Sequence, residues 1–167
     1  LTMTKADAVF YHGLNLEVQM FEFFDQLSVK RTVMAITEAI DTSKLLAYDD
    51  YENAHDPHIW MDPVIWAETI DPLVDKLCQI VPEKSDILKA NAAAYIHQLY
   101  ELNSYSEEVL SSVPSESAIL ITAHDAFAYF GAAYDFEVTG VQGISTNSEA
   151  GLYRIRELVD LLVDRNV

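Results

Sequence analysis

The most constraining feature of the sequence is one long helical pattern over residues 85–112. Apolar or small side chains recur there every three or four positions, at Leu88, Ala92, Tyr95, Leu99, Leu102, Ser106 and Val109. At 1.5 Å per residue, the pattern predicts a rod roughly 40 Å long. Because a helix of that length in a chain of 167 residues usually spans two packed units, we expect one lobe on each side of it.

Short apolar runs on both sides of this rod have the composition of buried strands. They cover residues 6–11, 31–36, 118–122 and 136–141. Helical patterns lie between or after them, at residues 16–26, 63–81, 125–134 and 148–163, and Pro72 is expected to kink or split the second of these. We also expect a loop at Gly140 and Gly143 and a capping box at residues 146–149. The alternation of strands and helices predicts an α/β fold, with two α/β lobes that contain parallel sheets.

The predicted lobes divide the chain into three parts. We expect residues 1–84 to form part of an N-terminal lobe, residues 85–112 the linking helix, and residues 113–167 the first part of a C-terminal lobe. Leu1 opens almost directly onto a strand-like run, and the last helical pattern stops where an α/β chain normally turns into its next strand. We therefore expect further sequence on both sides, and self-association of this piece through exposed sheet edges.

Charge and composition restrict the class of partner. The chain is 50% hydrophobic, enough to bury a core, and carries 27 acidic residues against 10 Lys and Arg, a formal net charge of -17. Such a charge repels nucleic acid and anionic membranes and favours a cation as ligand. The longest apolar run, residues 126–134, is about half of what a membrane-spanning helix requires. We expect no span of a membrane.

His124 is the sharpest candidate for a functional side chain. It directly follows the predicted strand at residues 118–122, at the carboxyl end, where open α/β sheets place their ligands. Its neighbour Asp125 can cap the next helix or support a ligand. A partly buried histidine hydrogen-bonded at a strand-helix corner is an equally good interpretation from position alone.

His58 is the second candidate, in the segment DPHIWMDP. Pro57 and Pro63 stiffen the chain on either side of it, which suits a ligand held in place before a metal arrives. Taken in isolation, the segment slightly favours a surface loop with an incidental histidine. His55 is a possible second ligand in the same loop, although a hydrated position fits it better.

The remaining candidates point to ordinary structural roles. His97 lies beside the apolar stripe of the long helix and is expected at the surface, while His12 follows a strand end and keeps a smaller claim as a ligand. Cys78, the single cysteine, favours a buried inert thiol over a nucleophile. The acidic loop at residues 41–62 lacks the spacing and the central glycine of an EF-hand, and the phosphate-loop, nucleophile-elbow and H-E-x-x-H motifs are absent from the sequence.

Three segments, taken in order, resemble one family. ADAVFYHGLNLE, DPHIWMDP and ITAHDAFAYFGAAYDFEVTGVQGISTNSEA are similar to segments of the zinc- or manganese-binding solute-binding proteins of bacterial ABC importers, the TroA-like or ZnuA-like group. The resemblance covers nearly the whole chain. It implies two α/β lobes joined by one long rigid helix, with a metal ion in the cleft between them and release through small movements.

The resemblance also implies a set of ligands and a function. His58 would be a metal ligand from the first lobe and His124 one from the second, whereas a further histidine upstream of Leu1 and an aspartate downstream of Val167 would complete the site. The implied function is capture of Zn²⁺ or Mn²⁺, with Fe²⁺ as a further candidate, and delivery to an ABC importer permease. The implied location is periplasmic or at the cell surface, with a lipid anchor as one option, and the protein would not be an enzyme. With two of four ligands, this piece is expected to bind metal weakly.

The sequence departs from the family pattern at two positions. His12 stands where relatives commonly have Asn, so it is not inherited as a ligand, and Asp135 stands where they commonly have Gly. Since Asp tolerates the left-handed conformation better than most residues, we expect the corner at Asp135 to survive. The His-rich loop of many zinc-importing members is absent from residues 41–62, which weakens a strict zinc assignment.

Two other functions remain open at the level of sequence. One is a metal-dependent hydrolase in which His124 binds the metal and Asp125 supports it, and the other is a host-binding adhesin. Catalytic zinc needs an open coordination position and a nearby general base. Two imidazoles with oxygen ligands suit Zn²⁺, Mn²⁺ or Fe²⁺, and the lack of thiolates disfavours Cu(I).

Overall fold

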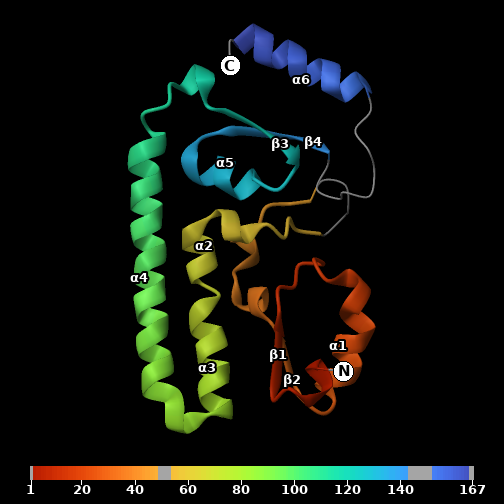
Figure 1. Ribbon diagram of the computed structural model, residues 1–167, viewed down its shortest axis with the longest axis vertical. Coiled ribbons are helices and arrows are strands. Elements are labelled where there is room, and N and C mark those ends of the chain that lie inside the picture. Colours follow the sequence, from red (N-terminus) through yellow and green to blue (C-terminus); the bar gives the residue numbers. More distant parts are fainter. Residues whose placement is uncertain (1, 49–53, 143–151, 166–167) are drawn as a thin grey trace. The chain divides into compact units, whose positions relative to one another are not determined.

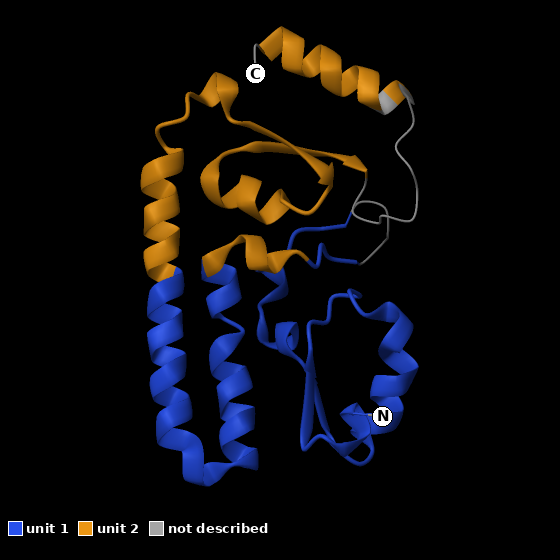
Figure 2. Cartoon of the chain, in the orientation of Figure 1, with its two compact units in different colours: residues 1–57, 64–99 blue, residues 58–63, 100–167 orange. Residues whose placement is uncertain are grey.

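The computed structural model describes residues 2–48, 54–142 and 152–165 (Figure 1). The chain divides into two compact units, shown in Figure 2: unit 1 holds residues 1–57 and 64–99, and unit 2 holds residues 58–63 and 100–167. None of the helices in the described ranges combines the length and the apolar content needed to cross a bilayer. The predicted limits of the lobes in the whole protein stay a prediction.

Unit 1 contains a parallel pair of strands covered by a helix. Strand β1 (Ala8–Tyr11) pairs with β2 (Thr32–Ala35), with Val9 opposite Val33, and α1 (Phe21–Ser28) connects them (Figure 1). Val9 is buried with Phe24 and Leu27 of α1. Since a right-handed crossover places the connecting helix on one face of the sheet, these apolar side chains meet and form a core. Both strands and their parallel order confirm the prediction.

Three helices complete unit 1, and a break separates the first two. The pattern at residues 63–81 forms α2 (Pro63–Ala67) and α3 (Ile70–Ile80), so the expected split occurs, and it begins four residues before Pro72. Proline lacks the N–H that would bond the carbonyl of Glu68, and its ring crowds that carbonyl. The proline therefore sits in the first turn of α3, where it is tolerated.

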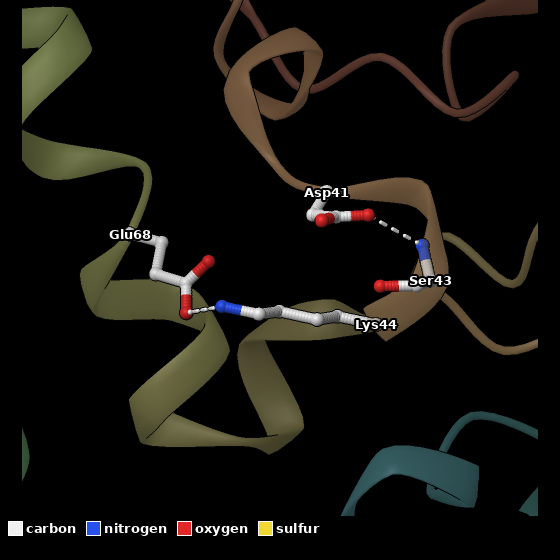
Figure 3. A network of polar contacts seen from close by, with 4 residues as sticks. All are labelled: Asp41, Ser43, Lys44 and Glu68. Carbon is white, nitrogen blue, oxygen red and sulfur yellow. Dashed lines mark hydrogen bonds and ion pairs between the residues drawn. The ribbon is translucent and has the colours of Figure 1, made fainter.

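The break is tied to the preceding loop by an ion pair. Lys44 Nζ lies 2.6 Å from Glu68 Oε1 (Figure 3). In the same loop, just before this lysine in the sequence, the Ser43 backbone N–H donates to the Asp41 carboxylate, which caps the turn η4 (Thr42–Lys44). The backbone N–H and the hydroxyl of Ser43 lower the pKa of Asp41 from its ordinary value. The loop and the helix break are thus held together in unit 1.

The long helix is confirmed as α4 (Ser85–Leu110), of 26 residues. In unit 1 its buried residues Ala92 and Leu99 pack against α2 and α3, as the apolar stripe predicted. Beyond Leu99 the predicted stripe is right at Ser106, which is half-buried, and wrong at Leu102 and Val109, which are 48% and 46% exposed. The other half-buried positions of α4 in unit 2 are Asn103 and Leu110. Asn103 is polar, and a hydropathy pattern cannot find a polar contact position.

Unit 2 contains a second parallel pair of strands. Strand β3 (Ile119–His124) pairs with β4 (Glu137–Gln142), and α5 (Ala128–Tyr134) connects them. The corner at Asp135 survives as expected, with φ 58° and ψ 38°. Gly140 lies inside β4, as the predicted strand at residues 136–141 requires, and this corrects the expectation of a loop at the same residue. The α/β class with parallel sheets and one long helix is confirmed.

The last helix of unit 2 is α6 (Leu152–Arg165). Leu158 is buried in it, while Ile155 and Val159 are exposed. Residues 148–151 of the predicted helix, Gly143 and the capping box at residues 146–149 lie outside the described residues. Short 3-10 turns link the larger elements, at η1 (Met3–Lys5), η2 (Val18–Met20), η3 (Ile36–Ala39), η4 (Thr42–Lys44), η5 (Ile59–Met61), η6 (Pro82–Lys84) and η7 (Ser115–Ser117).

Candidate metal centre

His58 stands at the start of the turn η5 in unit 2. Its carbonyl accepts a hydrogen bond from the Met61 N–H at 3.1 Å, and the Ile59 carbonyl accepts one from the Asp62 N–H at 3.1 Å. Ile59 is 0% exposed, and η5 packs against α5. This packing holds His58 in place, and its side chain is 7% exposed. The histidine is therefore buried, which corrects the interpretation that slightly favoured an incidental surface loop.

His124 is the last residue of β3, opposite Gln142 of β4. The strand was expected to end at Thr122, but the backbone continues because the Asp125 N–H donates to the Gln142 carbonyl at 3.0 Å. The Thr122 hydroxyl donates to the His124 carbonyl at 2.7 Å. These contacts fix His124 at the carboxyl end of the parallel pair, the edge where sheets of this class bind ligands.

Gly140 allows the end of β3 to take this course. A Cβ atom at Gly140 would meet the backbone of Asp125, Gln142 and His124. Only a residue without a side chain lets two backbones approach so closely. The glycine is therefore a structural requirement for the position of His124.

The structure brings the two candidate histidines together. The ring centres of His58 and His124 lie 5.7 Å apart, and the ring planes cross at 61°. Two imidazoles that share one zinc ion, each bonded at about 2.0–2.1 Å, have ring centres roughly 5 Å apart. A small adjustment of either side chain would therefore let both bind the same ion. Since residues 58–63 belong to unit 2, the pair lies within that unit.

Two aromatic side chains accompany the pair. The Trp60 ring centre lies 5.2 Å from that of His58, in an edge-to-face arrangement. The Tyr134 hydroxyl of α5 donates to Asn103 Oδ1 of α4 at 3.2 Å. Burial raises the pKa of Tyr134, a hydrogen bond with Ser106 opposes the rise, and the Asp62 carboxylate adds to it. Sequence reasoning missed both contacts, since neither Trp60 nor Tyr134 stood out by spacing.

Asp125 is not the N-cap residue of the helix that follows it. Helix α5 starts three residues later than expected, and its N-cap is Phe127. Asp125 therefore lies two residues before the N-cap position. Its backbone N–H instead extends the pairing of β3 with β4.

The other histidines lie apart from this pair along the chain. His12 is buried in unit 1; its backbone N–H donates to Glu17 Oε1 at 2.8 Å, and its carbonyl accepts from the Thr37 hydroxyl at 2.8 Å. His55 lines a cavity of about 260 Å³ in unit 1 and forms a bridge with Ala47. His97 is exposed, as expected. None of these observations gives His12 or His55 a role as a ligand.

The described residues offer two candidate ligands and not a complete site. No group of three or more His, Cys, Asp or Glu that could hold an ion occurs within residues 2–48, 54–142 and 152–165. Cys78 is half-buried against the helical core of unit 1, with Sγ 3.9 Å from the Ser85 carbonyl, in agreement with a packing role. His58 and His124 therefore require further ligands if they hold a metal in the coordination that zinc prefers.

Comparison with known proteins places these features in one family. The family model described as ZnuA, zinc-uptake complex component A, periplasmic, matches residues 1–167. The zinc-binding protein TroA of Treponema pallidum is 39% identical over 163 residues, 98% of this chain and 52% of that protein. The solved structure of TroA matches with a TM-score of 0.92 and 38% identity, covering 99% of this chain and 59% of that chain.

Two further proteins extend the comparison. The manganese-binding lipoprotein MntA of Bacillus subtilis is 36% identical over 165 residues, 99% of this chain and 54% of that protein. A laminin-binding adhesin of Streptococcus agalactiae matches in structure at 24% identity and a TM-score of 0.84, covering 99% of this chain and 61% of that chain, which shows a common fold alone. The chain spans about half the length of the curated relatives it matches.

Proposed function

Because the chain belongs to the family of zinc-uptake complex component A, periplasmic, we propose that it serves in the capture of a divalent transition metal ion. The ion would be bound outside the cytoplasmic membrane and delivered to the permease of an ABC importer. In this proposal the metal is cargo, and no bond chemistry is involved. An extracytoplasmic location, with a lipid anchor as in relatives named lipoproteins, forms part of the same proposal.

The observation that carries the proposal is the pairing of His58 with His124. Their ring centres are 5.7 Å apart, and each imidazole is held by a backbone fixed in unit 2. Two imidazoles together with oxygen ligands suit Zn²⁺, Mn²⁺ and Fe²⁺, and the pair includes no thiolate that would favour Cu(I). We propose that both side chains bind the ion, with the remaining ligands supplied by other parts of the protein.

The choice between zinc and manganese stays within the proposal. The relatives compared above include one named zinc-binding and one named manganese-binding, both more than 30% identical. Intrinsic affinity favours zinc over manganese for almost any set of nitrogen and oxygen ligands. Selectivity for manganese would therefore have to come from the geometry of the complete site or from metal availability.

The division of labour in the whole protein is also part of the proposal. Residues 1–84 and 113–167 would belong to two lobes joined by the helix at residues 85–112, with metal held between the lobes. A stiff helix resists wide closure, so release would depend on small movements near the ion.

Two alternatives carry less support. The hydrolase hypothesis takes His124 as the metal ligand and Asp125 as its support. The family is one of metal-uptake components, which points away from an enzyme. The adhesin hypothesis has a structural neighbour at 24% identity, and that likeness extends to the fold alone.

Isothermal titration calorimetry of the complete protein with Zn²⁺ and with Mn²⁺ tests the proposal. His58→Ala and His124→Ala should each weaken metal binding by at least tenfold. The double variant should weaken metal binding further, by the amount that loss of both ligands predicts. His97→Ala is the matched control, because His97 is an exposed histidine on α4. Absence of binding in the unchanged protein, or unchanged affinity in the double variant, would contradict the proposal.

A further inference from the structure

The side chain of His58 is bordered by two rings. His124 lies on one side, with its ring centre at 5.7 Å, and Trp60 lies on another, at 5.2 Å with the ring planes at 67°. Edge-to-face contact of this kind is attractive, because the positive edge of one ring meets the negative face of the other. The rotation of the His58 imidazole is therefore limited by a neighbour from its own turn as well as by its partner in the pair.

The backbone that carries both rings is fixed. Ile59, between the two, is fully buried, and the hydrogen bonds of η5 close the turn on either side of it. The whole turn packs against α5. The Cα atoms of His58 and Trp60 are therefore held at a fixed separation in unit 2, at which the two rings make an edge-to-face contact.

His58 and Trp60 differ in how much of each residue is exposed to solvent. His58 is 7% exposed, whereas Trp60 is 38% exposed, so solvent contacts the indole and hardly reaches the imidazole. A ligand that is oriented and shielded before the ion arrives loses less freedom on binding than one that must find its orientation. Partners that orient the ligands of a metal commonly change its affinity by 10- to 100-fold when they are removed.

We infer that Trp60 is a positioning residue, which holds the imidazole of His58 facing His124 and shields it from water. The inference rests on the proposed function, because it assumes that His58 binds the metal. Trp60 itself supplies no ligand atom, since an indole has a donor N–H and no lone pair available to a cation. Its action is on the orientation of the ring, and the aromatic edge is the feature required.

The test compares variants of the complete protein. In Trp60→Ala, we expect the affinity for Zn²⁺ to fall by about tenfold and the visible spectrum of bound Co²⁺ to change, because the imidazole is no longer held in one orientation. In Trp60→Phe, the aromatic edge remains, so both the affinity and the spectrum should stay close to those of the unchanged protein. Tyr105→Ala removes another exposed aromatic side chain of unit 2 and serves as the matched control.

The outcomes separate this inference from the proposed function. If the unchanged protein binds Zn²⁺ and Trp60→Ala binds it equally well with the same Co²⁺ spectrum, the inference is overturned and the proposed function stands. If Trp60→Phe binds Zn²⁺ as weakly as Trp60→Ala does, the aromatic edge is not the feature required, and that part of the inference is overturned. If the unchanged protein binds neither Zn²⁺ nor Mn²⁺, the proposed function fails and this inference fails with it.

A second variant keeps the inference testable if Trp60→Ala fails to fold. If circular dichroism shows that Trp60→Ala does not fold, Trp60→Leu fills most of the volume without supplying an aromatic edge. Weaker Zn²⁺ binding at an unchanged melting temperature then supports the inference, and unchanged binding overturns it.

Discussion

The hydroxyl of Tyr134 donates a hydrogen bond to Asn103 Oδ1 at 3.2 Å and so joins α5 to the long helix α4 within unit 2. The same hydroxyl is hydrogen-bonded with Ser106 and lies in the field of Asp62, the residue that follows η5. Since η5 packs against α5, this contact connects the long helix to the element that carries His58. Polar joints of this kind fix orientation as well as adding stability.

Tyr134→Phe should lower the free energy of unfolding by about 2 kcal/mol, the usual net value of two hydrogen bonds, since the hydroxyl bonds with both Asn103 and Ser106. Asn103 would also lose one of its partners while keeping access to water, which limits the loss. Chemical denaturation measures the change. Tyr153→Phe is the control, because Tyr153 is an exposed tyrosine of α6 in the same unit. Equal effects of the two substitutions would contradict the role assigned to Tyr134.

The raised pKa of Tyr134 predicts a loss of stability at high pH. Burial, together with the Asp62 and Glu107 carboxylates, raises it above the ordinary value of 10.0. Above pH 10.0 the unfolded chain releases the phenolic proton while the folded chain retains it, so the free energy of unfolding falls as the pH rises to the folded pKa. Denaturation curves between neutral and alkaline pH should show this fall, and Tyr134→Phe should reduce it.

Gly140→Ala should destabilise unit 2 and also displace His124. The added Cβ would meet the backbone of Asp125 and Gln142, and overpacking of this kind costs roughly 1–3 kcal/mol. Gly131→Ala is a matched comparison, because a Cβ there would meet the Phe136 carbonyl and the Val138 side chain instead. Both substitutions should lower the melting temperature, but at a temperature where both proteins are folded only Gly140→Ala should weaken metal binding.

The Lys44 and Glu68 ion pair should contribute little to stability. Their side chains are 48% and 31% exposed, and pairs of that exposure are worth about 0–1 kcal/mol because water screens them. Lys44→Met should therefore change the free energy of unfolding by less than about 1 kcal/mol, and the difference should shrink in high salt. A larger effect that persists in high salt would indicate that the pair does more than link the loop to the helix break.

The sequence predicts elements of this fold better than it predicts contacts. Strand composition and helical spacing located both parallel strand pairs and α4, because burial of an apolar face leaves a period in the sequence. Beyond Leu99 the predicted stripe of α4 was right at Ser106 but wrong at Leu102 and Val109, and it missed Asn103, whose polar side chain accepts a hydrogen bond from Tyr134.

The candidate site shows the same limit. His58 and His124 were found by their neighbours in the chain, a pair of prolines and a strand end. Trp60 was not, because an edge-to-face contact depends on side-chain rotation, which leaves no period in the sequence. Gly140 was assigned to a loop because glycine interrupts a strand pattern, whereas here it permits a close backbone approach inside a strand.

Asp135 offers a last prediction, since it ends α5 in the left-handed conformation at φ 58°. Glycine adopts this conformation without steric cost, and an acidic side chain at the C-terminal end of a helix opposes the helix dipole. Asp135→Gly should therefore raise the free energy of unfolding by about 1 kcal/mol, even after the greater freedom of glycine in the unfolded chain is counted.

Asp135→Asn separates the two contributions to that gain. Asparagine tolerates the left-handed conformation about as well as aspartate but carries no charge, so it removes only the unfavourable interaction with the dipole, worth about 0.3–1 kcal/mol. We expect the melting temperatures to increase in the order Asp, Asn, Gly. A gain for Asn equal to that for Gly would assign the whole effect to charge, and a loss for Gly would show that the side chain of Asp135 makes a favourable contact in the folded state.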